Sequence, residues 1–301
     1  MGAHRISPLI SGKGDLAFYL LLRLGLLTAR ALPFKRFANL CARLGRAAGH
    51  FSPARKVVSA NLRAVEAAGG RRADAGEVFE SYGRYWGELL ALAARPERCA
   101  ALRMEVSGLE HLIDARGRGA VCALGAHLGN WDLLGHWIAR DMPNMAFMVE
   151  RLRPARLFRL FENIRGSLSC SVLAAEGGGR ELYRHLRGGG HAGLLADRVI
   201  GAGWRSAPLL GGTRRIPSAG MDLARRAGAT LLPIFIRRHG LRFEIRIHPP
   251  LDEAEDPVIG FARALESEIL AAPEQWSLLY PLHDGEATVA PALAMKKAVA
   301  T

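Results

Sequence analysis

Residues 120–140 read AVCALGAHLGNWDLLGHWIAR, and this stretch decides the fold. The apolar run over 120–125 is typical of a strand that is buried on both faces of a parallel sheet. From Trp131 onward, apolar side chains recur at helical spacing. A buried strand that leads into an amphipathic helix is the repeating unit of an α/β fold. The polar residues between the two lie where open α/β sheets place ligands, outside the carboxyl end of a strand.

The same alternation continues along the chain. We predict strands at 120–125, 145–149, 194–196, 230–236 and 243–247, and helices at 131–140, 155–166, 179–187, 218–227 and 257–271. The last two strands flank His239-Gly240 and are predicted to form a hairpin. The sequence therefore predicts an α/β protein with a mainly parallel sheet flanked by helices.

The first hundred residues are predicted to be mostly helical. Ser52-Pro53 has the residues of an N-cap and first helical position, and Asp74 with Glu77 resembles a capping box. The helix that follows Asp74 should end by Pro96. We predict a helical, membrane-associating region over 1–100, an α/β core over 101–283 and a disordered tail over 284–301.

Residues 14–33 form the most hydrophobic stretch, but Arg23 interrupts it, so a clean membrane span is not predicted. We expect an amphipathic helix in the membrane interface. Its lipid-facing side chains would be Phe18, Leu21, Leu22, Leu26 and Leu27, and its headgroup-facing ones Arg23, Arg30, Lys35 and Arg36. A core helix of a soluble domain is the alternative.

The composition is globular and basic. Of 301 residues, 50% are apolar and 23% charged, which excludes a disordered chain. Basic residues number 41 against 28 acidic ones, a net charge of +13 that favours an anionic partner such as nucleic acid, a membrane face or a phosphate. The four cysteines have no paired spacing and indicate buried thiols in a reducing compartment.

His127 and Asp132 are the candidate chemical groups in the deciding stretch. An imidazole held by a carboxylate is a general base, and a turn containing Gly125 and Gly129 would let Asp132 fold back onto His127. Since G-x-S-x-G is absent, the base would activate a hydroxyl of the substrate. Two alternatives are that both residues are structural, and that they hold a metal together with His136.

The motif His127-Leu-Gly-Asn-Trp-Asp132 resembles the His-x4-Asp/Glu signature of glycerolipid acyltransferases. More narrowly, the chain resembles the bacterial lipid A late acyltransferase family, which includes phosphatidylinositol mannoside acyltransferases. The similarity runs from about Leu16 to Pro281. It rests further on Asn61-Leu-Arg63, Tyr82-Gly-Arg-Tyr-Trp86, Gly193-Leu-Leu-Ala-Asp-Arg198, Pro208-Leu-Leu-Gly211, Pro217–Ala224 and Pro273-Glu-Gln-Trp276. Trp276-Ser-Leu-Leu-Tyr-Pro281 is closer to the mannoside branch, whereas lipid A enzymes often carry Glu in place of Asp132.

The resemblance implies transfer of a fatty acyl chain from acyl-ACP or acyl-CoA to a hydroxyl of a membrane glycolipid. His127 would remove the proton and Asp132 would orient it. The implied substrate-binding residues are Asn130, Glu150, Arg151, Arg165, Asp197 and Arg198. Arg198 or backbone N–H groups would stabilise the oxyanion. No metal or cofactor is implied. The implied location is the cytoplasmic face of the inner membrane, in peripheral or monotopic form, with an anionic membrane surface as partner and no nucleic acid.

Two other functions remain open at this point. A hydrolase would use the same histidine to activate water and would release free fatty acid without any glycolipid. A basic nucleic-acid-binding protein would bind in a salt-sensitive way and would be indifferent to substitution of His127.

Overall fold

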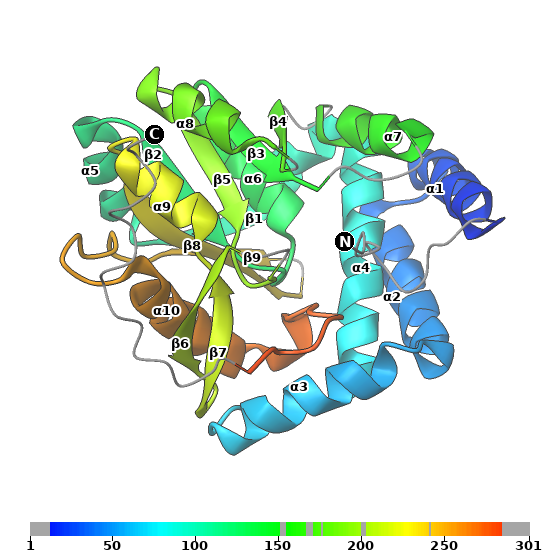
Figure 1. The fold of residues 1–301 in the computed structure, drawn as a ribbon. Coiled ribbons are helices and arrows are strands. Elements are labelled where there is room, and N and C mark those ends of the chain that lie inside the picture. The colour runs from blue at the N-terminus through cyan, green and yellow to red at the C-terminus, as the bar shows by residue number, and fades with distance from the viewer. Residues whose placement is uncertain are drawn as a thin grey trace.

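The computed structural model describes residues 13–150, 155–166, 171–175, 177–199, 203–240 and 242–284. Ten α-helices occur in these ranges, with their order in the chain visible in Figure 1. They are α1 (Lys13–Ala31), α2 (Phe34–Phe51), α3 (Arg55–Ala67), α4 (Ala75–Ala94), α5 (Leu109–Arg118), α6 (Trp131–Asp141), α7 (Ala155–Gly166), α8 (Gly179–Arg187), α9 (Ala219–Arg226) and α10 (Pro257–Ala271). Short 3₁₀ turns occupy Pro96–Ala101 and Pro273–Gln275.

The strands confirm the α/β prediction. Seven form one sheet in the order β1-β9-β8-β2-β5-β3-β4, and two form a separate antiparallel ribbon. They are β1 (Arg103–Ser107), β2 (Val121–Gly125), β3 (Met145–Val149), β4 (Ser171–Ala174), β5 (His191–Leu195), β6 (Trp204–Leu209), β7 (Gly212–Pro217), β8 (Thr230–His239) and β9 (Arg242–Ile247). The predicted hairpin exists as the antiparallel pair β8–β9, and the remaining pairs in the large sheet are parallel.

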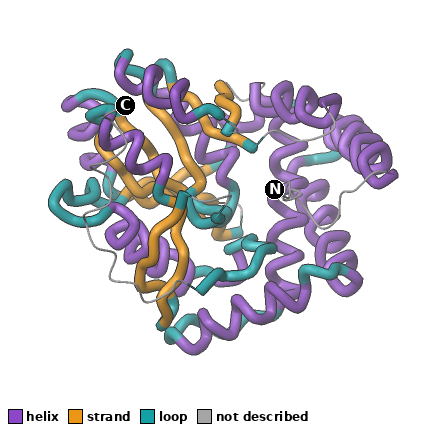
Figure 2. Tube along the Cα trace, in the orientation of Figure 1, coloured by secondary structure: helices purple, strands orange, loops and turns teal. Residues whose placement is uncertain are grey.

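Helices cover both faces of the sheet, so each face has its own core (Figure 1 and Figure 2). On β2, Val121 and Ala123 enter the core shared with α4 and α6, whereas Cys122 and Leu124 enter the core under α8, α9 and α10. This period of two, with both faces apolar, is the reason that β2 appears in the sequence as a continuous apolar run.

Helix α4 connects the N-terminal helices to the sheet. The Asp74–Glu77 capping box that opens it is present, and it ends at Ala94, before Pro96, as predicted. It packs so closely on α2 that a Cβ atom at Gly83 would overlap the carbonyl oxygen of Cys41. Ser52 caps differently from the prediction: its Oγ accepts the Ala54 N–H, and the helix begins only at Arg55.

Helix α1 is exposed on one side, but its orientation differs from the expected one. Leu22 is buried, and Phe18 and Leu26 pack against the core of the molecule. Leu21 and Leu27 are exposed as predicted, and they share the outward face with the leucines at 16, 20 and 24, each about half or more exposed. None of the helices in the described ranges is long and apolar enough to cross a bilayer. Of the predicted tail over 284–301, Asp284 is described and forms an isolated antiparallel bridge with Arg214, and 285–301 lie outside the described residues.

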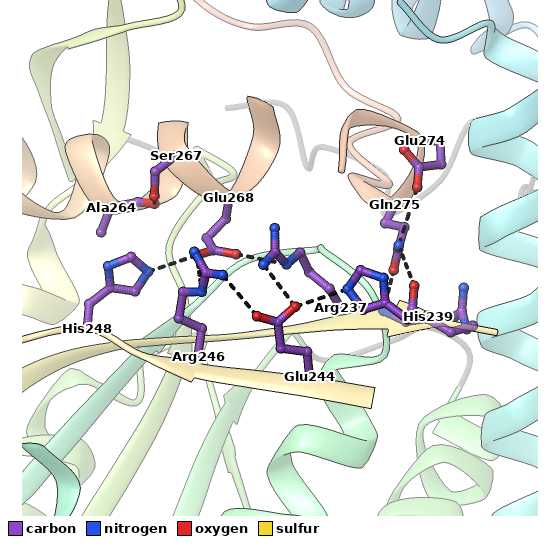
Figure 3. A network of polar contacts seen from close by, with 11 residues as sticks. Arg237, His239, Glu244, Arg246, His248, Ala264, Ser267, Glu268, Glu274 and Gln275 are labelled. Atoms are coloured by element: carbon purple, nitrogen blue, oxygen red, sulfur yellow. Dashed lines mark hydrogen bonds and ion pairs between the residues drawn. The ribbon is translucent and has the colours of Figure 1, made fainter. Parts of the chain in front are cut away.

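A network of charged groups lies between α10 and the β8–β9 hairpin (Figure 3). The carboxylate of Glu268, whose side chain is completely buried, lies 3.0 Å from His248 Nε2, 3.4 Å from Arg237 Nε and 3.5 Å from Arg246 Nε. Glu244 joins the same two arginines and His239. These ion pairs join the helix to the hairpin.

Candidate active site

The candidate site lies where β2 and β5 end. The two strands are parallel neighbours, with Gly125 opposite Leu195, and the Ala196 N–H continues the pairing by donating to the Gly125 carbonyl. His127 follows β2 and Asp197 follows β5, so the sheet brings the two side chains together at one edge. This is the edge that the deciding stretch predicted as the ligand-binding side.

His127 and Asp197 form a close pair. Nδ1 of His127 lies 2.8 Å from Oδ1 of Asp197, and the backbone N–H of His127 donates to Oδ2 at 2.9 Å. The Asp197 side chain has no exposed surface, whereas that of His127 is 24% exposed. Burial alone would raise the pKa of Asp197, but attraction by His127 and hydrogen bonds from His127 and Trp276 lower it below its ordinary value. The carboxylate is therefore held ionised against the imidazole.

Asp132 does not take the place that the sequence analysis gave it. Its carboxylate accepts the Tyr85 hydroxyl at 2.5 Å and the Arg165 Nε–H at 2.7 Å, while Asp197 occupies Nδ1 of His127. Burial, followed by the nearby charge of Asp132, raises the pKa of Tyr85 well above its ordinary value, so the phenol stays a donor. The expected orienting role of Asp132 toward His127 is thus corrected to a contact with α4 and α7.

The turn that begins α6 explains this direction. Gly129 has a φ of 62°, and a Cβ atom there would overlap the carbonyl oxygen of Ile236, so the turn requires glycine. Asn130 then caps the helix by accepting the Leu133 N–H. Asp132 consequently falls in the first turn of α6, on the side that faces Tyr85 and Arg165.

Asn130 was expected to bind substrate, but it is completely buried. Its Nδ2 donates to Glu88 on α4 at 2.9 Å. The Glu88 carboxylate also accepts a hydrogen bond from Nε of Arg238, near the end of β8, at 2.6 Å. Both polar atoms of the asparagine side chain are therefore used inside the protein. We correct its role to support of the turn that carries His127.

Two adjacent pockets share part of their lining, and His127 lines the larger one. The larger, of about 290 Å³, is lined by His127 and by polar and aromatic groups of α4, of the strand ends and of residues 277–280. The smaller, of about 70 Å³, is mostly apolar and runs between α6 and the sheet, past Ile138, Phe147 and Gly193. Both are lined by Trp131, Met148, Val149, Arg165, Leu194 and Leu195.

The other predicted site residues also surround the larger pocket. Arg198 donates to Glu150 at 2.9 Å and lies 4.0 Å from the centre of the Tyr280 ring. Glu150 follows β3, and Arg165 comes from α7, so three strand ends and a helix contribute. Arg151 lies outside the described residues. The structure therefore brings Glu150, Arg165, Asp197 and Arg198 together around His127.

Sequence reasoning gave no role to Tyr85, Glu88, Arg238 or Trp276. Tyr85 and Trp276 lie within motifs that support the family resemblance. Those motifs pointed to the family but did not indicate what either residue does. Glu88 and Arg238 meet from opposite ends of the chain and give no local signal. Within the described ranges, no three His, Cys, Asp or Glu side chains are grouped as metal ligands would be.

Comparison with known proteins identifies the chain as an acyltransferase. The family model of the bacterial lipid A biosynthesis acyltransferases matches residues 16–283, and the chain belongs to that family.

The similar curated proteins specify the branch. The chain is 34% identical over 215 residues to a phosphatidylinositol mannoside acyltransferase of Mycobacterium tuberculosis (strain CDC 1551 / Oshkosh), covering 67% of this chain and 68% of that protein. It is 32% identical over 211 residues to a protein of the same name from Mycolicibacterium smegmatis, covering 67% and 69%.

Proposed function

We propose that the chain transfers a fatty acyl group from acyl-ACP or acyl-CoA to a hydroxyl of a membrane glycolipid. The acceptor is of the lipid A precursor or phosphatidylinositol mannoside type, and the names of the similar proteins favour the mannoside type. The observation that carries the proposal is the pair His127–Asp197, which borders a pocket that shares part of its lining with an apolar pocket.

In the proposed reaction, Nε2 of His127 removes the proton from the acceptor hydroxyl. The hydroxyl oxygen attacks the thioester carbonyl carbon, and a tetrahedral intermediate forms. When the C–S bond breaks, His127 returns the proton to the sulfur, so the products are an ester and a free thiol. Asp197 holds the imidazole through Nδ1 and stabilises its charged form during the transfer.

The two pockets suggest where each substrate lies. The apolar pocket past Ile138 and Phe147 suits the end of an acyl chain, and the larger pocket suits the acceptor hydroxyl. The reacting carbonyl then falls at their junction, where Arg165 lines both pockets. We therefore assign Arg165, held by Asp132, to the oxyanion, and Arg198 with Glu150 to the acceptor headgroup.

The N-terminal helices supply a surface for membrane contact. Helix α1 exposes its outward leucines, and α2 exposes Leu40, Leu44 and Phe51, the last of which is 91% exposed. An apolar face beside Arg23, Lys35 and Arg43 fits peripheral binding to an anionic bilayer. Such binding would bring the site to a lipid acceptor on the cytoplasmic face of the inner membrane.

The test is transfer of a radiolabelled acyl chain, offered as acyl-ACP and as acyl-CoA, to a phosphatidylinositol mannoside or to a lipid A precursor in vesicles. His127→Ala should lower the rate by about 10³-fold, since general bases contribute on the order of 10²–10⁴. His111→Ala on α5 is the matched control and should transfer normally.

Each outcome of this assay separates the candidates. Labelled lipid that depends on His127 supports the transferase and identifies donor and acceptor. Free fatty acid formed at the same rate without glycolipid indicates a hydrolase. Transfer that survives His127→Ala contradicts the proposed mechanism.

A further inference from the structure

The segment 275–282, which we name the closing segment, is hydrogen-bonded to the turn that carries His127. The Gly129 N–H donates to the Gln275 carbonyl at 3.0 Å, and the Ser277 N–H donates to the His127 carbonyl at 2.7 Å. Leu128 and Trp276 form an isolated antiparallel bridge between these two bonds. The closing segment thus fixes the backbone on both sides of the catalytic turn.

Trp276 extends from the closing segment to the buried carboxylate. Its side chain is nearly inaccessible, and its indole Nε1–H donates to Oδ2 of Asp197 at 3.0 Å. Oδ2 also accepts the backbone N–H of His127, which leaves Oδ1 directed at the imidazole. An indole can only donate, so Oδ2 is the acceptor in this contact, which holds the carboxylate in one orientation.

The far side of the closing segment is bound by one buried asparagine of α3. Nδ2 of Asn61 donates to the Leu278 carbonyl at 3.2 Å and to the Tyr280 carbonyl at 2.9 Å, and its Oδ1 accepts the Leu282 N–H at 3.3 Å. A single side chain therefore anchors the segment at three points. The segment lies between this anchor and the turn of His127.

We propose that Trp276 is a positioning residue of the His127–Asp197 pair, and that Asn61 holds the segment that presents it. The inference rests on the proposed function of His127 as a base. The indole N–H takes up part of the negative charge of Asp197 through its hydrogen bond to Oδ2. Without this donor the carboxylate attracts the imidazolium more strongly. In the variant, His127 would therefore lose its proton and become able to act as a base only at higher pH.

Other titratable groups line the pocket beside the pair and stay in place in the test. They are Tyr82 and Tyr85 from α4, Glu150 after β3, Arg165 from α7, Arg198 after β5 and Tyr280 of the closing segment itself. A shift in the pH profile is therefore assigned to the indole only if it depends on Asp197.

Trp276→Phe removes the N–H and keeps an aromatic ring. We expect kcat to fall by about tenfold, the order that one hydrogen bond to a charged group supports, with little change in KM. The acid limb of the pH–rate profile should move to higher pH. The control is Trp204→Phe, at a tryptophan of the β6–β7 ribbon. It should change neither kcat nor the acid limb of the pH–rate profile.

A double-mutant cycle distinguishes positioning from a general structural role. If Trp276 acts through Asp197, adding Trp276→Phe to Asp197→Asn costs little further activity, whereas a structural defect multiplies the two losses. Should Trp276→Phe not fold, Asn61→Ser provides the second variant. It should shift the acid limb in the same direction by a smaller amount, with the exposed Asn163→Ser on α7 as control.

The inference and the proposed function fail separately. A wild-type kcat and pH profile in Trp276→Phe, while His127→Ala is inactive, overturns the positioning role alone. Losses that multiply in the cycle overturn it as well. Full activity of His127→Ala overturns the base on which both rest.

Discussion

Two histidines in this molecule lie against completely buried carboxylates, and the difference between them shows what makes a site. His127 meets Asp197 at 2.8 Å with its side chain 24% exposed, and His248 meets Glu268 at 3.0 Å with its side chain 19% exposed. Distance and burial therefore do not separate the two pairs. Their neighbours do.

Glu268 divides its charge among His248 and two arginines, as Figure 3 shows, and the His248 ring packs edge-on against Phe235. The described partners of Asp197 are neutral N–H donors and the imidazole of His127, and that ring faces a pocket. A carboxylate already neutralised by arginine stabilises an imidazolium less than one directed at the imidazole alone. We therefore expect the His127–Asp197 pair to support catalysis and the His248–Glu268 pair to stabilise the fold.

The largest effect should follow Asp197→Asn. The amide cannot stabilise a charged His127, and we expect kcat to fall by about 10⁴-fold, the loss seen when a triad carboxylate becomes an amide. Steady-state acyl transfer measures this, with circular dichroism to confirm folding. Asp132→Asn should cost less and should leave the acid limb of the pH profile in place, since Asp132 acts on Arg165. A larger loss in Asp132→Asn would restore the pairing first expected from the sequence.

Glu268→Gln should instead weaken the fold. Removing the carboxylate leaves Arg237, Arg246 and His248 without their shared buried partner, which costs about 3 kcal/mol. Urea unfolding measures the loss, and activity per folded molecule should be unchanged. The exposed Glu253→Gln serves as control. A catalytic defect without loss of stability would contradict the division between the two pairs.

The pattern of apolar residues in each strand explains how much of the fold could be predicted from the sequence. The runs that became β2, β3 and β8 were visible because strands apolar on both faces leave a continuous signal. β1 was missed because its residues alternate between exposed and half-buried, and the β6–β7 ribbon because it is interrupted by arginine and proline.

The parallel topology places His127, Glu150 and Asp197 at one edge of the sheet, and the sequence analysis predicted this edge as the ligand-binding side from His127. Which carboxylate reaches His127 depends on β5 lying beside β2, although β3 comes between them in the chain. That lateral order is a tertiary property, and the local spacing favoured Asp132. The contact of Glu88 with Arg238 depends in the same way on packing of α4 against the sheet.

The third prediction concerns the apolar pocket that accompanies the His127 pair. Phe147→Ala should enlarge it and raise the preference for a chain two carbons longer by about tenfold, since each buried methylene contributes roughly 0.8 kcal/mol. Competition between two acyl thioesters measures the ratio of kcat/KM. The exposed Ile113→Ala on α5 should leave the ratio unchanged. An unchanged ratio in Phe147→Ala would place the chain end elsewhere.

The smallest effect is expected at Glu244, in the structural network of Figure 3. Burial would raise its pKa, but hydrogen bonds from Arg246 and His239 and the charge of Arg237 lower the value from 4.5 to about 2. Because the folded pKa is depressed, the carboxylate stabilises the fold above pH 4.5, and this contribution is lost as the pH falls toward 2. Glu244→Gln should therefore reduce stability by less than about 1 kcal/mol near neutral pH, since the group is partly solvated.

Urea midpoints at pH 7 and pH 3 test this sign. The deficit of Glu244→Gln against wild type should shrink at pH 3, whereas a deficit of equal size at both values would mean that packing and not charge is responsible. Acyl transfer at neutral pH should be the same in both proteins. Asp197 also has a lowered pKa, and under the proposed function its ionisation affects the chemistry because its charge faces an imidazole beside a pocket. A depressed carboxyl pKa therefore marks an ion pair, and only its surroundings decide whether that pair can catalyse.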